Sequence, residues 1–138
     1  MPKTIHQSVK LPAAADRLYD MYLDSKLHSA FTGGQVTINP VVGSEFNAFE
    51  GMLTGRVLAL SPKRLIVQSW RGKDWKPEDA DSVLVLSFLP EGDVSRIELV
   101  HVNVPDYEFE DIYQGWEKYY WKPWREYLLK EIGIKKAA

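Results

Sequence analysis

Three histidines, at positions 6, 28 and 101, are the side chains of this sequence best suited to acid–base or metal chemistry. They fall on different predicted elements and lack the spacing of metal ligands. Glu98 lies three residues before His101 on one predicted strand, so the two side chains point to opposite faces and cannot form an acid–base pair in one pocket. No nucleophile motif and no glycine-rich phosphate loop occurs. A non-enzymatic protein is expected, with a cavity enzyme that uses one carboxylate and a tyrosine as the remaining alternative.

The overall composition narrows the class of protein further. The chain has 138 residues and is 45% hydrophobic, which suits one well-buried core, so we expect a single domain over residues 1–138. A formal net charge of -2 gives no basic field for phosphate binding and argues against a nucleic-acid partner. There is no cysteine, which excludes disulfides and thiolate metal sites, and no cofactor is expected. Because no signal peptide and no membrane-length apolar run is visible, a cytoplasmic protein without a membrane partner is expected.

The spacing of apolar residues predicts an antiparallel sheet interrupted by two short helices. Strand-like alternation or turn-bounded apolar runs occur at residues 4–11, 35–40, 46–50, 53–60, 65–71, 81–89 and 94–104. Residues 13–23 have helical spacing, and a second short helix begins near Asp24 or Ser25 and stops at Gly33-Gly34. Gly51 and Gly55 are expected to let a strongly bent strand pass close to another element, and a bulge is expected between Phe46 and Phe49.

From Asp106 onward the period is that of one long helix. Its apolar stripe consists of Phe109, Ile112, Trp116, Tyr119, Tyr120, Trp124, Tyr127 and Leu128. Pro123 lies in the interior and should kink or divide the helix just before Trp124. The fold class is therefore α+β, a curved antiparallel sheet wrapped around a long C-terminal helix, with two short helices after the first strand and an apolar cavity between sheet and helix.

Alternation places a set of candidate cavity residues on the inner face of this sheet and on the helix that covers it. These are Gln68, Trp70, Leu86, Phe88, Leu99, His101, Trp116 and Tyr120. Trp70 and Trp116 are either cavity walls or core residues that hold the sheet to the helix. Gln68 and His101 either contact a ligand or are hydrogen-bonded in a dry interior, for example to Tyr119 or Tyr120.

A second candidate site is the polar loop of residues 72–80, which contains one tryptophan. Arg71, Lys73 and Lys76 surround Trp75 in the sequence. An exposed tryptophan among cations is typical of an anchor for a partner surface, so Arg71 and Trp75 are candidate docking residues. The alternative is that Trp75 folds back onto the sheet edge and the charges are solvated.

Several motifs together resemble a known family. They are F-x-x-F-x-G at Phe46, Phe49 and Gly51, the following Gly55, the turn from Leu60 to Pro62, IVQSWR ending at Arg71, Trp75, Gly115-Trp116 and Tyr120, with LYDMYLD and AFTGG upstream. In these the chain resembles the C-terminal domain of the activator of Hsp90 ATPase, which belongs to the helix-grip, START-like (Bet v 1-like, SRPBCC) superfamily.

The resemblance implies a helix-grip fold and two classes of function. As an interaction protein, the chain would be a co-chaperone that docks on an Hsp90-type chaperone. As a carrier or sensor, it would enclose a small hydrophobic molecule in the cavity between sheet and helix, as stand-alone members of the superfamily often do. Cavity volume is the discriminating observation, because a pocket of about 300 Å³ or more favours the carrier.

Overall fold

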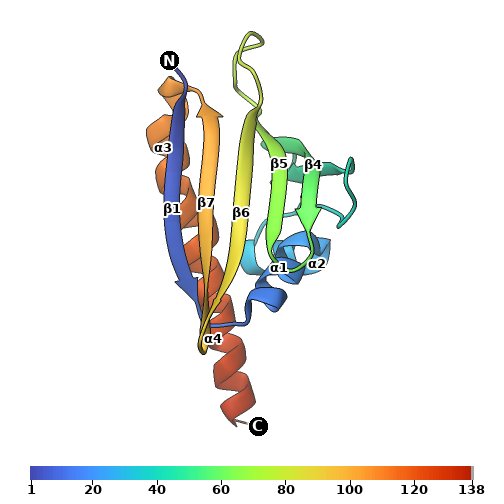
Figure 1. Cartoon of the computed structure of the whole chain (residues 1–138), viewed down its shortest axis with the longest axis vertical. Coiled ribbons are helices and arrows are strands. Elements are labelled where there is room, and N and C mark those ends of the chain that lie inside the picture. The colour runs from blue at the N-terminus through green and yellow to red at the C-terminus, as the bar shows by residue number, and fades with distance from the viewer. Residues whose placement is uncertain (138) are drawn as a thin grey trace.

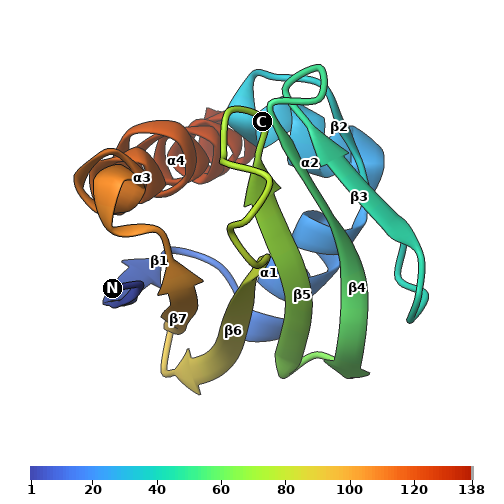
Figure 2. The same ribbon diagram turned by 90° about the horizontal axis from the view of Figure 1, so that it is seen from above.

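The computed structural model describes residues 1–137, with side-chain surroundings for residues 1–133, as one α+β unit. Seven strands form one antiparallel sheet in the order β1-β7-β6-β5-β4-β3-β2. Their bounds are β1 Lys3–Leu11, β2 Val36–Thr37, β3 Glu45–Ala48, β4 Leu53–Ser61, β5 Leu65–Gly72, β6 Ser82–Glu91 and β7 Val94–Val104. The sheet is strongly curved, and all the helices lie inside its curve (Figure 1, Figure 2). The predicted fold class is confirmed.

Two short helices follow β1 and close one half of the concave face. They are α1 (Ala15–Leu23) and α2 (Ser25–Thr32). The carboxylate of Asp24 accepts a hydrogen bond from the backbone N–H of Leu27 at 3.0 Å, which caps α2 as predicted. Gly33 ends α2 in the left-handed conformation, with φ of 79°. The chain then turns toward the short edge strand β2.

The inner face of the sheet follows the predicted alternation. Along β5 the buried residues are Ile66, Gln68 and Trp70, and β6 and β7 bury Leu84, Leu86, Phe88, Ile97, Leu99 and His101 in the same way. Gly55 of β4 lies so close to β5 that a Cβ there would be 1.9 Å from the carbonyl oxygen of Ser69. This confirms the close approach expected at Gly55, whereas the close approach expected at Gly51 is wrong, because a Cβ there would have no neighbour within 4 Å.

The predicted bulge between Phe46 and Phe49 is instead a tight left-handed turn. β3 ends at Ala48, and Phe49, Glu50 and Gly51 all have positive φ, at 57°, 58° and 85°. The backbone N–H of Phe49 donates to the carbonyl of Gln35, which holds the turn against the chain entering β2. The turn keeps Phe46 buried and leaves Phe49 half-buried at the edge of the core.

The C-terminal helix runs along the concave face and is not divided at Pro123. It comprises η1 (Asp106–Glu108), α3 (Phe109–Gly115), the π-helical segment η2 (Trp116–Trp121) and α4 (Lys122–Ala137). The backbone N–H of Lys122 donates to the carbonyl of Glu117, five residues back. The wide turns of η2 therefore directly precede the proline, whose nitrogen has no hydrogen to donate.

The π-helical segment changes which aromatic side chains face the sheet. Tyr119, predicted on the apolar stripe, is 53% exposed, whereas Trp121, outside that stripe, is 3% exposed. The placement of Tyr119 on the buried stripe was wrong because a period of 3.6 residues does not hold through η2. Trp121 instead packs on β1 and donates its indole N–H to Gln7 at 2.8 Å. None of the helices in residues 1–137 is long and apolar enough to cross a membrane.

Candidate ligand-binding cavity

An open cavity of about 530 Å³ lies between the sheet and the first half of the C-terminal helix. The end of α2 supplies Gly33 and Gly34, and the left-handed turn supplies Phe49. The opposite wall comes from Trp70 of β5 and from α3 and η2. The wall is largely apolar and includes five aromatic rings, those of Phe49, Trp70, Trp116, Tyr119 and Tyr120. A concave, mostly apolar space of this size is typical of small-molecule sites, which measure about 300–1,000 Å³.

Three of the eight residues predicted for the cavity line it, namely Trp70, Trp116 and Tyr120. The other five, Gln68, Leu86, Phe88, Leu99 and His101, are fully buried on the same face of the sheet but lie in the packed core and not on the cavity wall. Their alternation gave the correct face. It did not show which of these residues pack directly against the helices and which line the space left open between sheet and helix.

The sequence reasoning missed the wall formed by α2 and the left-handed turn. A Cβ on Gly34 would lie 2.3 Å from Cδ1 of Phe49, so only glycine allows the phenylalanine ring to lie where it does. From the sequence alone, Gly33-Gly34 predicts only a helix stop, and the spacing of residues 46–50 predicts a strand that includes Phe49. The sequence signal that could have indicated this wall is the double glycine at Gly33-Gly34 together with the F-x-x-F spacing of Phe46 and Phe49.

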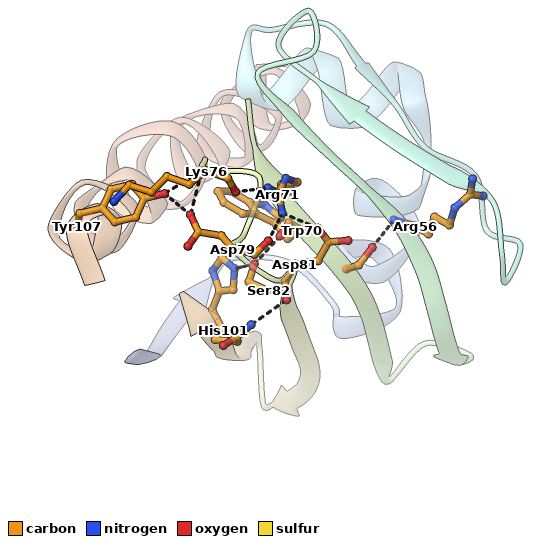
Figure 3. A network of polar contacts seen from close by, with 11 residues as sticks. Arg56, Trp70, Arg71, Lys76, Asp79, Asp81, Ser82, His101 and Tyr107 are labelled. Atoms are coloured by element: carbon orange, nitrogen blue, oxygen red, sulfur yellow. Dashed lines mark hydrogen bonds and ion pairs between the residues drawn. The ribbon is translucent and has the colours of Figure 1, made fainter. Parts of the chain in front are cut away.

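His101 links the two tryptophans of the wall from behind. The indole N–H of Trp116 donates to Nδ1 of His101 at 3.3 Å, so the neutral ring carries its proton on Nε2, which lies 2.8 Å from Oγ of Ser82. Ser82 in turn donates to the backbone carbonyl of Trp70 at 2.6 Å (Figure 3). Burial lowers the pKa of His101 to about 3, so the ring is neutral at physiological pH. His101 therefore positions Trp116 relative to Trp70.

A second buried histidine supports the other side of the cavity. Nδ1 of His28 lies 2.7 Å from the carbonyl oxygen of Tyr22 and must donate to it, so Nε2 accepts the hydrogen of the Tyr120 hydroxyl at 2.9 Å. Burial lowers the pKa of His28 to about 4, against a smaller opposing effect of the bond to Tyr22. Burial also raises the pKa of Tyr120. The tyrosine thus remains a neutral donor toward the histidine.

Gln68 is hydrogen-bonded within the core and does not face the cavity. The hydroxyl of Tyr22 donates to Oε1 of Gln68 at 2.5 Å, and both side chains are fully buried. The predicted alternative of a hydrogen-bonded core glutamine is the one observed, with Tyr22 as partner in place of Tyr119 or Tyr120.

The loop of residues 73–81 folds back against the end of β5. Trp75 is 7% exposed, its ring lies over Gly72, and its centroid is 5.8 Å from that of Trp70. Arg71 donates to the backbone carbonyls of Asp79 and Lys76, at 2.7 and 2.6 Å, and bridges to Asp81 at 3.1 Å (Figure 3). The alternative of a folded-back Trp75 is the one observed.

The same loop is fastened to the start of the C-terminal helix. The hydroxyl of Tyr107 in η1 donates to the carboxylate of Asp79, and this bond is the main reason that the pKa of Asp79 is lowered. Lys76 places its ammonium 4.8 Å from the ring centroid of Tyr107 (Figure 3). The loop is therefore tied to η1 and, through Trp75, packs against Trp70 of the cavity wall.

All five tryptophans form one unbroken row of neighbouring rings. The distances between the ring centroids of successive neighbours are 5.8 Å for Trp75 and Trp70, 6.3 Å for Trp70 and Trp116, 5.6 Å for Trp116 and Trp121, and 6.4 Å for Trp121 and Trp124. Phe31 of α2 stacks on the last of them at 4.1 Å. The row connects the loop, the sheet and the helix, and the cavity opens beside its middle members.

The donor set of the cavity gives no indication of a metal ion. Within the part of the chain that the structure describes, no three histidine, aspartate or glutamate side chains gather as a metal site.

The indole N–H of Trp70 is buried and has no hydrogen-bond partner among the described residues. It is thus a donor on a cavity-lining residue whose hydrogen-bonding capacity is unused.

Comparison with protein families gives one match over most of the chain. The family model described as "Activator of Hsp90 ATPase homolog 1-like protein" matches residues 12–128. A human protein named "Activator of 90 kDa heat shock protein ATPase homolog 1" is 29% identical over 107 residues, which are 78% of this chain and 31% of the human protein. The corresponding homolog of Dictyostelium discoideum is 27% identical over 117 residues, 84% of this chain and 30% of that protein. The chain thus spans about a third of the length of these relatives.

Solved structures share the fold at lower sequence identity. An HSP90 activator from Plasmodium falciparum, PFC0360w, superposes with a TM-score of 0.75 at 19% identity, covering 97% of this chain and 96% of that one. The Aha1 dimer from Colwellia psychrerythraea gives 0.76 at 15% identity, with 91% and 96% covered. CalU16 from Micromonospora echinospora gives 0.71 at 22% identity, with 85% and 71% covered. These likenesses concern the fold alone.

Proposed function

The chain belongs to the Activator of Hsp90 ATPase homolog 1-like family, and from this premise we propose that it is a non-enzymatic domain that binds a small hydrophobic molecule between its sheet and its C-terminal helix. The observation that carries the proposal is the cavity of about 530 Å³. It exceeds the 300 Å³ or so that separates a carrier from a packed docking module.

The wall of the cavity suits a flat, apolar ligand. Trp70 and Trp116 have centroids 6.3 Å apart with planes inclined by 39°, and Tyr120 lies 4.8 Å from Trp116. The side chains of Trp116 and Tyr120 are hydrogen-bonded to the neutral rings of His101 and His28, and the backbone of Trp70 accepts a hydrogen bond from Ser82, the partner of His101. A preformed aromatic wall favours binding because little ordering is required when the ligand enters.

The experiment is native mass spectrometry of the protein purified from its own host under mild conditions. A bound species should be present in the wild-type protein and absent in Gly115→Leu, which places a side chain on the cavity wall. A Cβ on Gly115 meets only Tyr119, at 3.6 Å, so the substitution starts without a backbone clash. Gly133→Leu in α4, away from the cavity, is the matched control. A wild-type protein that carries no adduct and binds no member of a library of apolar compounds would contradict the proposal.

A second candidate function is docking on an Hsp90-type chaperone, and it is favoured by the names of the human and Dictyostelium relatives. Arg71 and Trp75 remain the proposed docking residues. Because Trp75 is 7% exposed and Arg71 has three partners in the loop, they would act by shaping the loop whose exposed residues include Lys73 and Lys76.

The docking proposal predicts stimulation of ATP hydrolysis by the Hsp90 of the same organism. Trp75→Ala should abolish the stimulation because the loop loses its anchor, whereas Trp75→Phe should retain most of it. Both variants need a thermal denaturation curve to show that the fold persists. No stimulation by saturating wild-type protein would rule this function out while leaving ligand binding untouched.

A further inference from the structure

The aromatic cavity carries one charged group of its own, and this points to the class of ligand. Resting on the proposed ligand-binding function, we infer that the preferred ligands are hydrophobic amines, which combine an apolar body with one cationic nitrogen. Asp111 of α3 is the single charged residue on the cavity wall, and neither lysine nor arginine contributes to that wall in the described part of the chain.

The rings of the wall are arranged so that a cation can meet several aromatic faces. Phe49 and Tyr120 are 6.3 Å apart and inclined by 64°, and Trp116 and Tyr120 are inclined by 51°. Mutually tilted rings around a concave space present their negative faces from different directions, as in sites that recognise organic ammonium groups. An ammonium within about 6 Å of such a face is attracted to the negative charge of the ring face, whereas a carboxylate is not.

The chain itself provides an example of this attraction at the rim. The ammonium of Lys118 lies 5.2 Å from the ring centroid of Tyr119, which is also part of the cavity wall. Tyr119 is therefore already engaged, and the rings of Phe49, Trp70, Trp116 and Tyr120 remain for a ligand cation.

Carboxylates gather at the end of the cavity where Asp111 lies. The pKa of Glu108 is raised by burial and by the nearby carboxylates of Asp111 and Asp74. None of these three carboxylates forms an ion pair among the described side chains. In the neighbouring loop, Arg71 bridges to Asp81 and Lys76 lies over Tyr107, whereas Lys73 is exposed and its backbone N–H donates to the carbonyl of Met52 on the cavity wall. Three carboxylates without an ion pair against one such lysine leave this end negative, so the local field favours a cationic ligand.

The test is isothermal titration calorimetry at pH 7 and low salt with three probes that share one ring system: 2-naphthylmethylamine, 2-naphthylmethanol and 2-naphthoate. The amine should bind about five- to tenfold more tightly than the alcohol, and the alcohol more tightly than the acid. Asp111→Asn should reduce the preference for the amine to about two- to threefold, which is the part due to the rings. Glu110→Gln, an exposed neighbour on α3 that is not on the wall, should leave all three affinities unchanged.

The outcomes separate the two proposals. If the alcohol binds, Gly115→Leu abolishes its binding, and the amine binds no more tightly, the amine preference is wrong and the ligand-binding function stands. If none of the probes binds, the amine preference is overturned, and if binding survives Gly115→Leu, both proposals are overturned. An amine preference that Glu110→Gln weakens as much as Asp111→Asn would mean attraction by the general surface charge and would also overturn the assignment to the cavity.

Discussion

The indole of Trp121 stacks on that of Trp116, five residues earlier, with ring centroids 5.6 Å apart and planes inclined by only 21°. Side chains five residues apart do not share a face of an α-helix, but the wider turn of a π-helix brings them together. This stacking is what allows the helix to present Trp116 to the cavity and Trp121 to β1 at the same time.

The first prediction follows from this register. Trp121→Ala should lower the free energy of unfolding by about 3–5 kcal/mol, since it removes a buried indole and its bond to Gln7. Tyr119→Ala should change it by less than about 0.5 kcal/mol because the side chain is half exposed. Urea denaturation of both variants is the measurement. A larger loss for Tyr119→Ala would show that the helix keeps an α-helical register.

The second prediction concerns the hydroxyl of Tyr120. In Tyr120→Phe the buried Nε2 of His28 loses its donor, and an unpaired buried acceptor should cost about 1–3 kcal/mol of stability. Tyr113→Phe, on the exposed side of α3, is the control and should change stability by less than about 0.5 kcal/mol. Long-range proton–nitrogen NMR spectra should also find the His28 proton on Nδ1. A proton on Nε2 would contradict the assigned donor direction.

The third prediction is a loss of stability between pH 6.5 and 4. Burial lowers the pKa of His28 to about 4 and that of His101 to about 3, below the ordinary histidine value of 6.5. As the pH falls below 6.5, these histidines become protonated in the unfolded chain but stay neutral in the folded chain. The free energy of unfolding is therefore highest above pH 6.5 and decreases below it. For His28 alone the loss should reach about 3 kcal/mol by pH 4.

Unfolding curves in urea at a series of pH values measure this slope. The interval from pH 6 to 5 is the most informative, because ordinary carboxylates titrate mainly below it. His28→Asn and His101→Asn should each reduce the number of protons taken up on unfolding, which sets the slope, by about one. This holds even where the substitution also lowers stability at pH 7. An unchanged slope in both variants would mean that the histidines are not responsible.

The fourth prediction compares two glycines of the cavity wall. Gly34→Ala forces the ring of Phe49 away from a Cβ that would otherwise lie 2.3 Å from it, and should cost about 1–3 kcal/mol. Gly115→Ala meets nothing closer than 3.6 Å and should be neutral or stabilising by up to about 1 kcal/mol. Thermal denaturation checks both. Equal costs at the two positions would contradict the close contact of Gly34 with Phe49.

Local periodicity was sufficient to predict most of the sheet. The alternation along β5, β6 and β7 gave the buried face, including the polar residues Gln68 and His101, because a strand has a fixed period of two. The burial of Trp121 in place of Tyr119 could not be predicted, since the π-helical segment depends on tertiary packing and on Pro123 together.

The cavity was harder to predict than the sheet. Its missed wall depends on the left-handed turn at Phe49 and on contact with Gly34, fifteen positions earlier, which no local pattern encodes. Trp75 was ambiguous for a related reason. Its burial requires Gly72 beneath the ring and a loop fastened by Arg71 and Tyr107, three features that are separate in the sequence.

The unbroken row of five indoles gives the protein an optical property of its own. Rings about 6 Å apart couple their excited states, so light absorbed at Trp75 can migrate along the row as far as Trp124. The circular dichroism of the folded chain should accordingly contain a contribution from coupling between neighbouring indoles. Because Trp70 and Trp116 are the members of the row that line the cavity, a quencher placed there would dim the emission of all five tryptophans at once.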